Sequence, residues 1–186
     1  LSPATKQTYN SNAGGYFAPF LKFSGFDALE LQGKADRPVV VFIDGDNNKV
    51  QIFESTLEDI NAYAVSEELH EYFAKDEADK RTISVVSSGI GARTSYWAGM
   101  NFSFYDVRRK AVRLKQAGRG GGGTVLHNKG IIALVVKRTH FTGLENDPVD
   151  IKAIQRAGAS LHKRIHDLDD KQCKMRSAGT AHLTEI

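Results

Sequence analysis

The sequence predicts an α+β fold of two β-β-β-β-α units, whose antiparallel sheets pack on two helices. Short apolar runs of strand length recur in both halves of the chain. A Ser-Thr-Leu-Glu capping box at 55–58 predicts a helix after the first four runs. A second helix is predicted after Asp147-Pro148, where apolar residues recur at steps of three and four. Strands in groups of four argue against an alternating parallel α/β domain.

The first half, about residues 16–77, follows a polar and loose N-terminal segment. Runs rich in aromatic and aliphatic residues predict strands at 16–23, 28–31, 37–44 and 49–55. The helix that begins at the capping box carries its apolar residues on one side, and these are Leu57, Ile60, Ala64 and Leu69.

The second half, about residues 81–168, repeats this plan. Strands are predicted at 81–87, 95–106, 110–116 and 130–138, with a flexible glycine-rich loop at 118–123. The second helix is amphipathic, and its apolar positions are Ile151, Ile154, Ala157, Leu161, Ile165 and Leu168. We therefore expect residues 1–186 to form a single domain of two structural halves with a loose C-terminal tail.

Composition limits the classes of protein that the chain can belong to. Hydrophobic residues make up 41% and charged residues 25%, as in folded globular proteins. No apolar run approaches the roughly 20 residues of a membrane span, so no membrane partner is expected. The only cysteine, Cys173, excludes an intrachain disulfide and a cysteine-based zinc site, and indicates a reducing interior.

Charge is distributed unevenly along the chain. Residues 1–77 hold 6 Lys and Arg against 13 Asp and Glu, whereas residues 78–186 hold 19 against 9. A basic second half favours a polyanionic partner.

The stretch FIDGDNN at 42–48 has two interpretations. It resembles the first strand of an NYN domain, in the PIN-like nuclease class, where acids after a strand hold Mg²⁺. Such chemistry needs several converging carboxylates, and the strands at 81–87 and 130–138 end in none. Asp44 and Asp46 are therefore interpreted as a hairpin turn. A metal-dependent nuclease that uses them remains the alternative.

Residues 92–123 interleave aromatic and basic side chains on predicted strands. Alternation places Arg113 and Lys115 on one face, with Val112 and Leu114 toward the core. Cations for phosphates and rings for stacking are what single-stranded nucleic acid requires. The predicted binding residues are Arg93, Tyr96, Trp97, Arg108, Arg109, Lys110, Arg113, Lys115, Arg119 and Lys129. No catalytic residue, metal ligand or cofactor is predicted.

The element order, with its basic and aromatic strands, resembles the Whirly-type fold, over about residues 16–168. This family includes plant single-stranded DNA-binding proteins and kinetoplastid mitochondrial guide RNA-binding proteins, and its β-β-β-β-α units resemble PUR and PC4 domains. The Lys-Gly-Lys-Ala signature of plant members is absent, and AVRLKQAGR at 111–119 is a loose basic counterpart. The resemblance implies oligomers, often tetramers, in a mitochondrion or other organelle.

The resulting hypothesis is a non-catalytic single-stranded nucleic-acid-binding protein, with RNA preferred over DNA. Its sheet face would contact the nucleic acid, and it would form homo- or hetero-oligomers. Beside the nuclease alternative stands a capsid or assembly protein with a basic inner face.

Overall fold

The computed structural model describes residues 2–57, 60–140 and 149–185. Two compact units make up the chain, Leu1–Phe141 and Thr142–Ile186. The α+β class is confirmed, because the first unit combines a sheet with helices on its faces.

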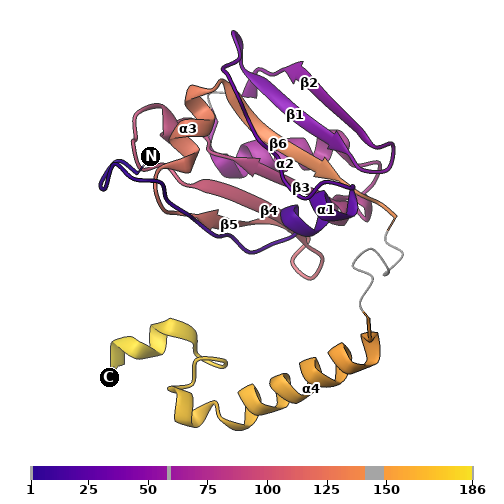
Figure 1. The fold of residues 1–186 in the computed structure, drawn as a ribbon, viewed down its shortest axis with the longest axis vertical. Helices are drawn as coiled ribbons and strands as arrows, with labels where there is room; N and C mark the ends of the chain where they lie inside the picture. Colours follow the sequence, from indigo (N-terminus) through magenta and orange to yellow (C-terminus); the bar gives the residue numbers. More distant parts are fainter. Residues whose placement is uncertain (1, 58–59, 141–148, 186) are drawn as a thin grey trace. The chain divides into compact units, whose positions relative to one another are not determined.

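The first unit is built around one mixed sheet of six strands, in the order β2-β1-β6-β3-β4-β5 (Figure 1). Strands β1 and β6 run parallel, and every other neighbouring pair runs antiparallel. The strands are β1 (Val39–Asp44), β2 (Lys49–Glu54), β3 (Ile83–Ser87), β4 (Met100–Asp106), β5 (Ala111–Ala117) and β6 (Ile131–Lys137).

The central strands carry continuous apolar runs because both of their faces are covered. All seven residues of β6 and all five of β3 are buried. Strands buried on two faces do not need polar residues at alternate positions. The edge strands β2 and β5 alternate or face solvent instead.

Helix α2 (Ala62–Phe73) covers one face of the sheet, which we call the α2 face. Asn61 caps it, since its side-chain oxygen accepts hydrogen bonds from the amides of Tyr63 and Ala64, both at 3.0 Å. Val65 and Leu69 are buried against β1, β3 and β6 in one apolar cluster. In Figure 1 this helix lies behind the sheet.

The opposite face, which we call the α1 face, has a less continuous cover. Helix α1 (Phe17–Phe23), an extended segment at 26–31 and helix α3 (Gly122–Asn128) contribute to it. Phe17, Phe20 and Leu21 point from α1 into the cluster, and Leu126 does so from α3.

The second unit contains helix α4 (Ile151–Asp167), capped by Asp150, whose carboxylate accepts a hydrogen bond from the Ala153 amide at 2.8 Å. The helix is amphipathic as predicted, yet none of its residues is buried within its unit. Asp147 and Pro148, the predicted start, lie outside the described residues. Across the described ranges, no helix has the length and apolar character needed to cross a membrane.

Several predicted elements differ from the observed ones. One mixed sheet replaces the predicted two antiparallel sheets, because β6 inserts between β1 and β3. Residues 17–23 form a helix, since burial at positions 17, 20 and 21 follows a helical period. Residues 28–31 are extended without pairing in the sheet, and α2 begins at its Asn61 cap and not at the capping box of 55–58.

Candidate functional site

The acidic turn at 44–47 closes a hairpin, as predicted. Strands β1 and β2 pair through Asp44 and Lys49. One carboxylate oxygen of Asp44 accepts hydrogen bonds from the amides of Asp46 and Asn47, at 3.2 and 3.1 Å. Asp44 therefore shapes the turn through its own backbone.

Asp46 holds the chain that leaves β6. Its carboxylate accepts hydrogen bonds from the Thr139 amide at 3.0 Å and from the Thr139 hydroxyl, and it lies 3.5 Å from the Arg138 guanidinium. Burial raises the pKa of Asp46, but the hydrogen bonds from Thr139 and His140 outweigh it, so the net shift of the pKa is downward. This carboxylate is fully used inside the protein.

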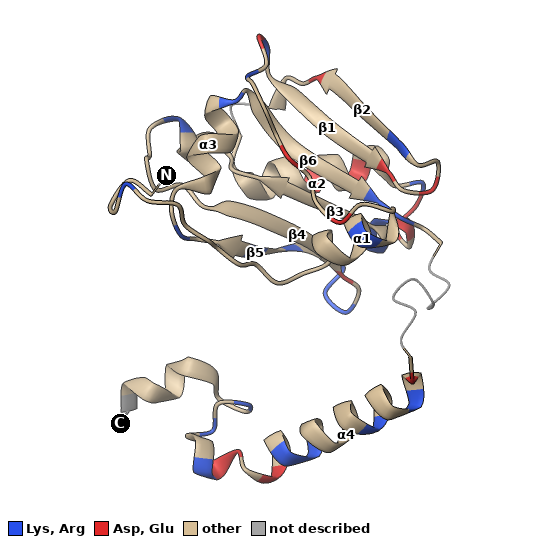
Figure 2. Cartoon of the chain, in the orientation of Figure 1, with Lys and Arg blue, Asp and Glu red and all other residues tan. Residues whose placement is uncertain are grey.

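The predicted nucleic-acid-binding residues lie at separate places. Arg108, Arg109 and Lys110 form the turn between β4 and β5, seen as a basic loop in Figure 2. Tyr96, Trp97 and Arg119 lie beyond the opposite ends of these strands. Each strand has seven residues, so roughly 20 Å separates the two groups. Arg113 and Lys115 are exposed on edge strand β5, Arg93 is exposed in a 3-10 helix, and Lys129 follows α3.

The glycine-rich turn at 118–123 is tightly packed and not a loose loop. A Cβ atom at Gly121 would lie 2.2 Å from the Tyr96 carbonyl oxygen, and one at Gly123 would lie 2.2 Å from the Gly99 carbonyl oxygen. A Cβ at Gly120 would meet the Tyr9 ring at 2.2 Å. Gly120 and Gly121 also have φ of +73°, a region that favours glycine. Glycine is required here because two backbone segments touch.

A polar pocket of about 540 Å³ opens beside this turn. The Arg119 amide donates a hydrogen bond to the Ser11 hydroxyl at 3.1 Å, which joins the two segments that form the pocket. The exposed Arg119 side chain makes no hydrogen bond or ion pair with any residue in the described part of the chain. The residues that line this polar pocket are Asn10, Ser11, Asn12, Gln116, Gly118 and Arg119.

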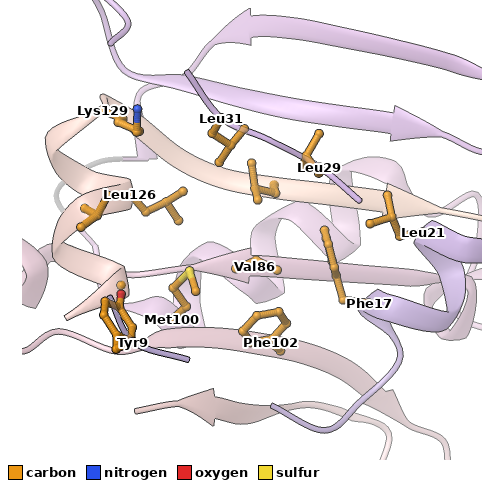
Figure 3. Close-up of a pocket in the computed structure, with 13 residues that line it drawn as sticks. Tyr9, Phe17, Leu21, Leu29, Leu31, Val86, Met100, Phe102, Leu126 and Lys129 are labelled. Atoms are coloured by element: carbon orange, nitrogen blue, oxygen red, sulfur yellow. The ribbon is translucent and has the colours of Figure 1, made fainter. Parts of the chain in front are cut away.

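An apolar cavity of about 400 Å³ lies on the α1 face next to the same turn (Figure 3). Gly122 belongs to its wall, and Tyr9 precedes Asn10 of the polar pocket. Core side chains from α1, β3, β4, α3 and β6 form its floor and sides, and these are Phe17, Leu21, Val86, Met100, Phe102, Leu126 and Leu134.

The polar pocket presents amides, hydroxyls and a guanidinium, which are suited to an anion. No group of three or more His, Cys, Asp or Glu side chains that could hold a metal exists within residues 2–57, 60–140 and 149–185. The arrangement can therefore bind an anionic group but offers no set of side-chain metal ligands.

Sequence reasoning named Arg119 and Lys129 only as nucleic-acid-binding residues, and it did not single out Tyr9 or residues 10–12, which form the other side of the pocket. The signal was present in YNSNAGG at 9–15, where amide side chains precede two glycines. Nothing in a single sequence indicates that this segment lies beside a turn about 108 residues away.

Comparisons with known proteins identify relatives. A family model described as aldehyde ferredoxin oxidoreductase, N-terminal domain, matches residues 1–138. The tungsten-containing aldehyde ferredoxin oxidoreductase of Pyrococcus horikoshii is 36% identical over 139 residues, which are 73% of this chain and 20% of that protein. The Pyrococcus furiosus protein of the same name is 31% identical over 178 residues, which are 86% of this chain and 27% of that protein.

A solved structure is also similar. The BamBC active-site complex of benzoyl coenzyme A reductase, bound to 1,5-dienoyl-CoA, has a TM-score of 0.58 and 28% identity, and the match covers 78% of this chain and 21% of that chain. The chain therefore spans about a fifth to a quarter of the length of these proteins.

These relatives overturn the hypothesis of a non-catalytic single-stranded nucleic-acid-binding protein of the Whirly type. The nuclease and capsid alternatives are wrong for the same reason. The error came from element order, because helix α1 and the segment 28–31 had been taken as two strands. Without them the two halves no longer share a four-strand plan.

Proposed function

Since the chain belongs to the family of aldehyde ferredoxin oxidoreductase N-terminal domains, we propose that it forms the N-terminal part of an oxidoreductase. Its role in that enzyme is to hold an anionic group of the redox cofactor in the polar pocket. Aldehyde oxidation coupled to ferredoxin reduction is the activity proposed for the whole protein, after the names of its relatives.

One observation carries this proposal. The family match over residues 1–138 includes both segments that form the polar pocket, 10–12 and 116–119. These segments are joined by the bond from the Arg119 amide to Ser11, and the glycines between Arg119 and α3 fit against backbone. A turn that is conformationally restricted in this way holds Arg119 beside the pocket without a partner of its own.

Arg119 is the residue best suited to bind the anion. A guanidinium donates several hydrogen bonds in a planar fork that matches carboxylate or phosphate oxygens. A hydrogen bond to a charged group contributes about 1.5–3 kcal/mol, so its removal would weaken binding by roughly 10- to 100-fold. Asn10, Ser11 and Asn12 add amide and hydroxyl groups on the other side.

The tungsten named in the relatives would not be ligated by this chain's described side chains, because they contain no suitable cluster of His, Cys, Asp or Glu. A direct tungsten–protein site does not fit these residues. The proposal therefore concerns the anionic part of a cofactor, and no reaction step is assigned to the metal.

Titration with inorganic pyrophosphate tests the binding role. We expect the amide NMR signals of Gly118 to Gly121 to shift saturably in the native protein. Arg119→Gln should weaken the affinity at least tenfold. Arg108→Gln is the matched control, since Arg108 is exposed in the turn at the other end of β5 and should bind normally.

Activity is measured on the enzyme in its native context. In extracts of cells that carry the Arg119→Gln gene, the rate of aldehyde-dependent dye reduction should be at least tenfold lower than in extracts with the native gene. Extracts with Arg108→Gln should keep the native rate. Equal pyrophosphate affinity in both variants would disprove the role of the pocket. Unchanged activity in Arg119→Gln extracts would disprove its link to the reaction.

A further inference from the structure

The apolar cavity on the α1 face is a second site, distinct from the polar pocket. It is lined by side chains from α1, the segment 29–31, β3, β4, α3 and β6 (Figure 3). A volume of about 400 Å³ is within the range of about 300–1,000 Å³ that small-molecule pockets occupy. The cavity is therefore large enough for a ligand of benzene-ring size with a short substituent.

One polar atom enters this apolar space. A Cβ at Gly122 would lie 3.1 Å from both the Tyr9 hydroxyl oxygen and the Met100 methyl carbon, so these two groups meet over Gly122. Figure 3 shows Tyr9 and Met100 together at one end of the pocket. Within the described ranges, the Tyr9 hydroxyl has no hydrogen-bond partner from the protein. A hydroxyl in this position can donate a hydrogen bond to a ligand.

The walls of the cavity are fixed by interactions at both ends. Lys129 donates a hydrogen bond to the Gly33 carbonyl at 2.8 Å, and the Ala35 amide donates one to the Lys129 carbonyl at 2.9 Å. These bonds hold the segment that carries Leu29 and Leu31 against α3. At the other end, the Tyr9 ring packs on Gly120. A cavity with restrained walls loses little conformational entropy when a ligand enters.

We propose that this cavity binds a small uncharged apolar molecule that carries one hydrogen-bond acceptor. The hydrocarbon part lies on the leucine, phenylalanine and methionine walls, and the acceptor takes a hydrogen bond from the Tyr9 hydroxyl. The lining favours an uncharged ligand, because all of its other residues are uncharged and its one charged residue, Lys129, donates a hydrogen bond to the Gly33 carbonyl. This site goes beyond the proposed function, which concerns an anion held by Arg119.

Methionine-methyl NMR of the whole chain tests the proposal. The chain has two methionines, Met100 in the cavity and Met175 in the second unit. Titration with acetophenone should shift the Met100 methyl signal saturably and leave Met175 unchanged. Ethylbenzene, which has a similar shape but no acceptor, should bind about fivefold more weakly, because one neutral hydrogen bond contributes about 1 kcal/mol.

Tyr9→Phe keeps the ring and removes only the hydroxyl, so the fold is retained. In Tyr9→Phe, acetophenone and ethylbenzene should bind with nearly equal affinity. The control is Tyr96→Phe, which should keep the fivefold difference, because Tyr96 is 77% exposed and does not line the cavity. A Met100 signal that does not move, or that moves together with Met175, would overturn the proposal. So would an unchanged preference in Tyr9→Phe. Arg119→Gln should bind acetophenone normally, which separates this test from that of the proposed function.

Discussion

Two polar regions of the sheet unit, around His70 and around the glycine-rich turn, differ in how far the protein satisfies their polar groups. On the α2 face, His70 is fully buried, and its ring nitrogens contact the Ser103 hydroxyl at 2.9 Å and the Lys80 carbonyl at 3.1 Å. Near the glycine-rich turn, the Tyr9 hydroxyl and the Arg119 guanidinium have no protein partner among the described residues. His70 belongs to the buried side of helix α2, whereas Tyr9 lines the apolar cavity and Arg119 lines the polar pocket.

This difference separates stabilising groups from groups available to a ligand. A buried polar group with all its partners inside the protein contributes to stability, since breaking its bonds leaves a costly unsatisfied atom. A group held in place by backbone packing but without a partner contributes little to stability and can bind something else. The three predictions below test whether the groups that stabilise the fold are different from the groups that are available to a ligand.

The largest effect is expected at Gly123, where the glycine-rich turn joins α3. A Cβ there would lie 2.2 Å from the Gly99 carbonyl oxygen and 2.8 Å from that of Ala98, and both atoms are backbone. The Gly123 amide also donates a hydrogen bond to Ala98 at 2.8 Å. Gly123→Ala must therefore displace the backbone of residues 98–99, which leads into β4, and should lower the free energy of unfolding by roughly 4 kcal/mol, measured by urea denaturation.

Gly118→Ala is the matched control in the same turn. A Cβ at Gly118 would meet nothing within 4 Å, and its φ is not positive. The change in unfolding free energy should stay within about 0.5 kcal/mol. If both alanine variants were equally stable, the turn would be loose and could not position Arg119.

The second prediction concerns pH and the buried His70. Burial lowers the pKa of His70 to about 4 from its ordinary value of 6.5. Between pH 6.5 and 4 the unfolded chain therefore binds a proton at this residue that the folded chain does not. Stability should fall as the pH drops through this window, by about 3 kcal/mol in total. Urea denaturation at a series of pH values measures this loss.

His70→Gln separates this residue from the rest of the protein. Glutamine keeps hydrogen-bonding atoms near Ser103 but does not titrate, so the slope of stability should become nearly flat between pH 6.5 and about 5, above the range in which carboxyls of lowered pKa such as Asp46 and Asp79 contribute. Lys80 and Glu71 are the charged groups that face His70, and neither changes its charge in this variant. An unchanged slope would show that other groups cause the acid sensitivity.

The sequence predicted most of the sheet, because its strands carry clear apolar runs. Strands β1, β2, β3, β5 and β6 lie within two or three residues of their predicted ranges, and helix α4 follows its predicted periodicity. The aromatic run at 16–23 was misassigned because Phe and Tyr favour strands, whereas contacts with the sheet give α1 a helical burial pattern. Tertiary packing of this kind leaves little signal in local propensity.

Less of the candidate site was predictable. Arg119 was named for its charge as a nucleic-acid-binding residue, together with the basic turn at 108–110, which lies at the far end of β5. The pocket depends on contact between residues 10–12 and 116–119. It also depends on Gly121 and Gly123, which lie directly against the backbone carbonyls of Tyr96 and Gly99. Such contacts follow from topology, and the position of β6 between β1 and β3 could not be read from the order of elements.

The smallest of the three effects is expected at Asp46, a polar group that is satisfied inside the protein. Its two carboxylate oxygens accept hydrogen bonds from the amide and the hydroxyl of Thr139. In Asp46→Asn an NH₂ group would replace one acceptor and face these donors. The free energy of unfolding should fall by roughly 1 to 2 kcal/mol, measured by urea denaturation.

Asp44→Asn is its control, because one oxygen of Asp44 accepts both backbone amides of the turn and asparagine retains that oxygen, while the bond lost from the Asn47 side chain is solvent-exposed. Its loss should stay within about 0.5 kcal/mol. Pyrophosphate affinity at the Arg119 pocket should be unchanged in both variants, since neither aspartate lines that pocket. If Asp46→Asn bound pyrophosphate more weakly, a carboxylate that is satisfied within the protein would also affect binding at the Arg119 pocket. Stabilising groups and ligand-binding groups would then not be separate sets.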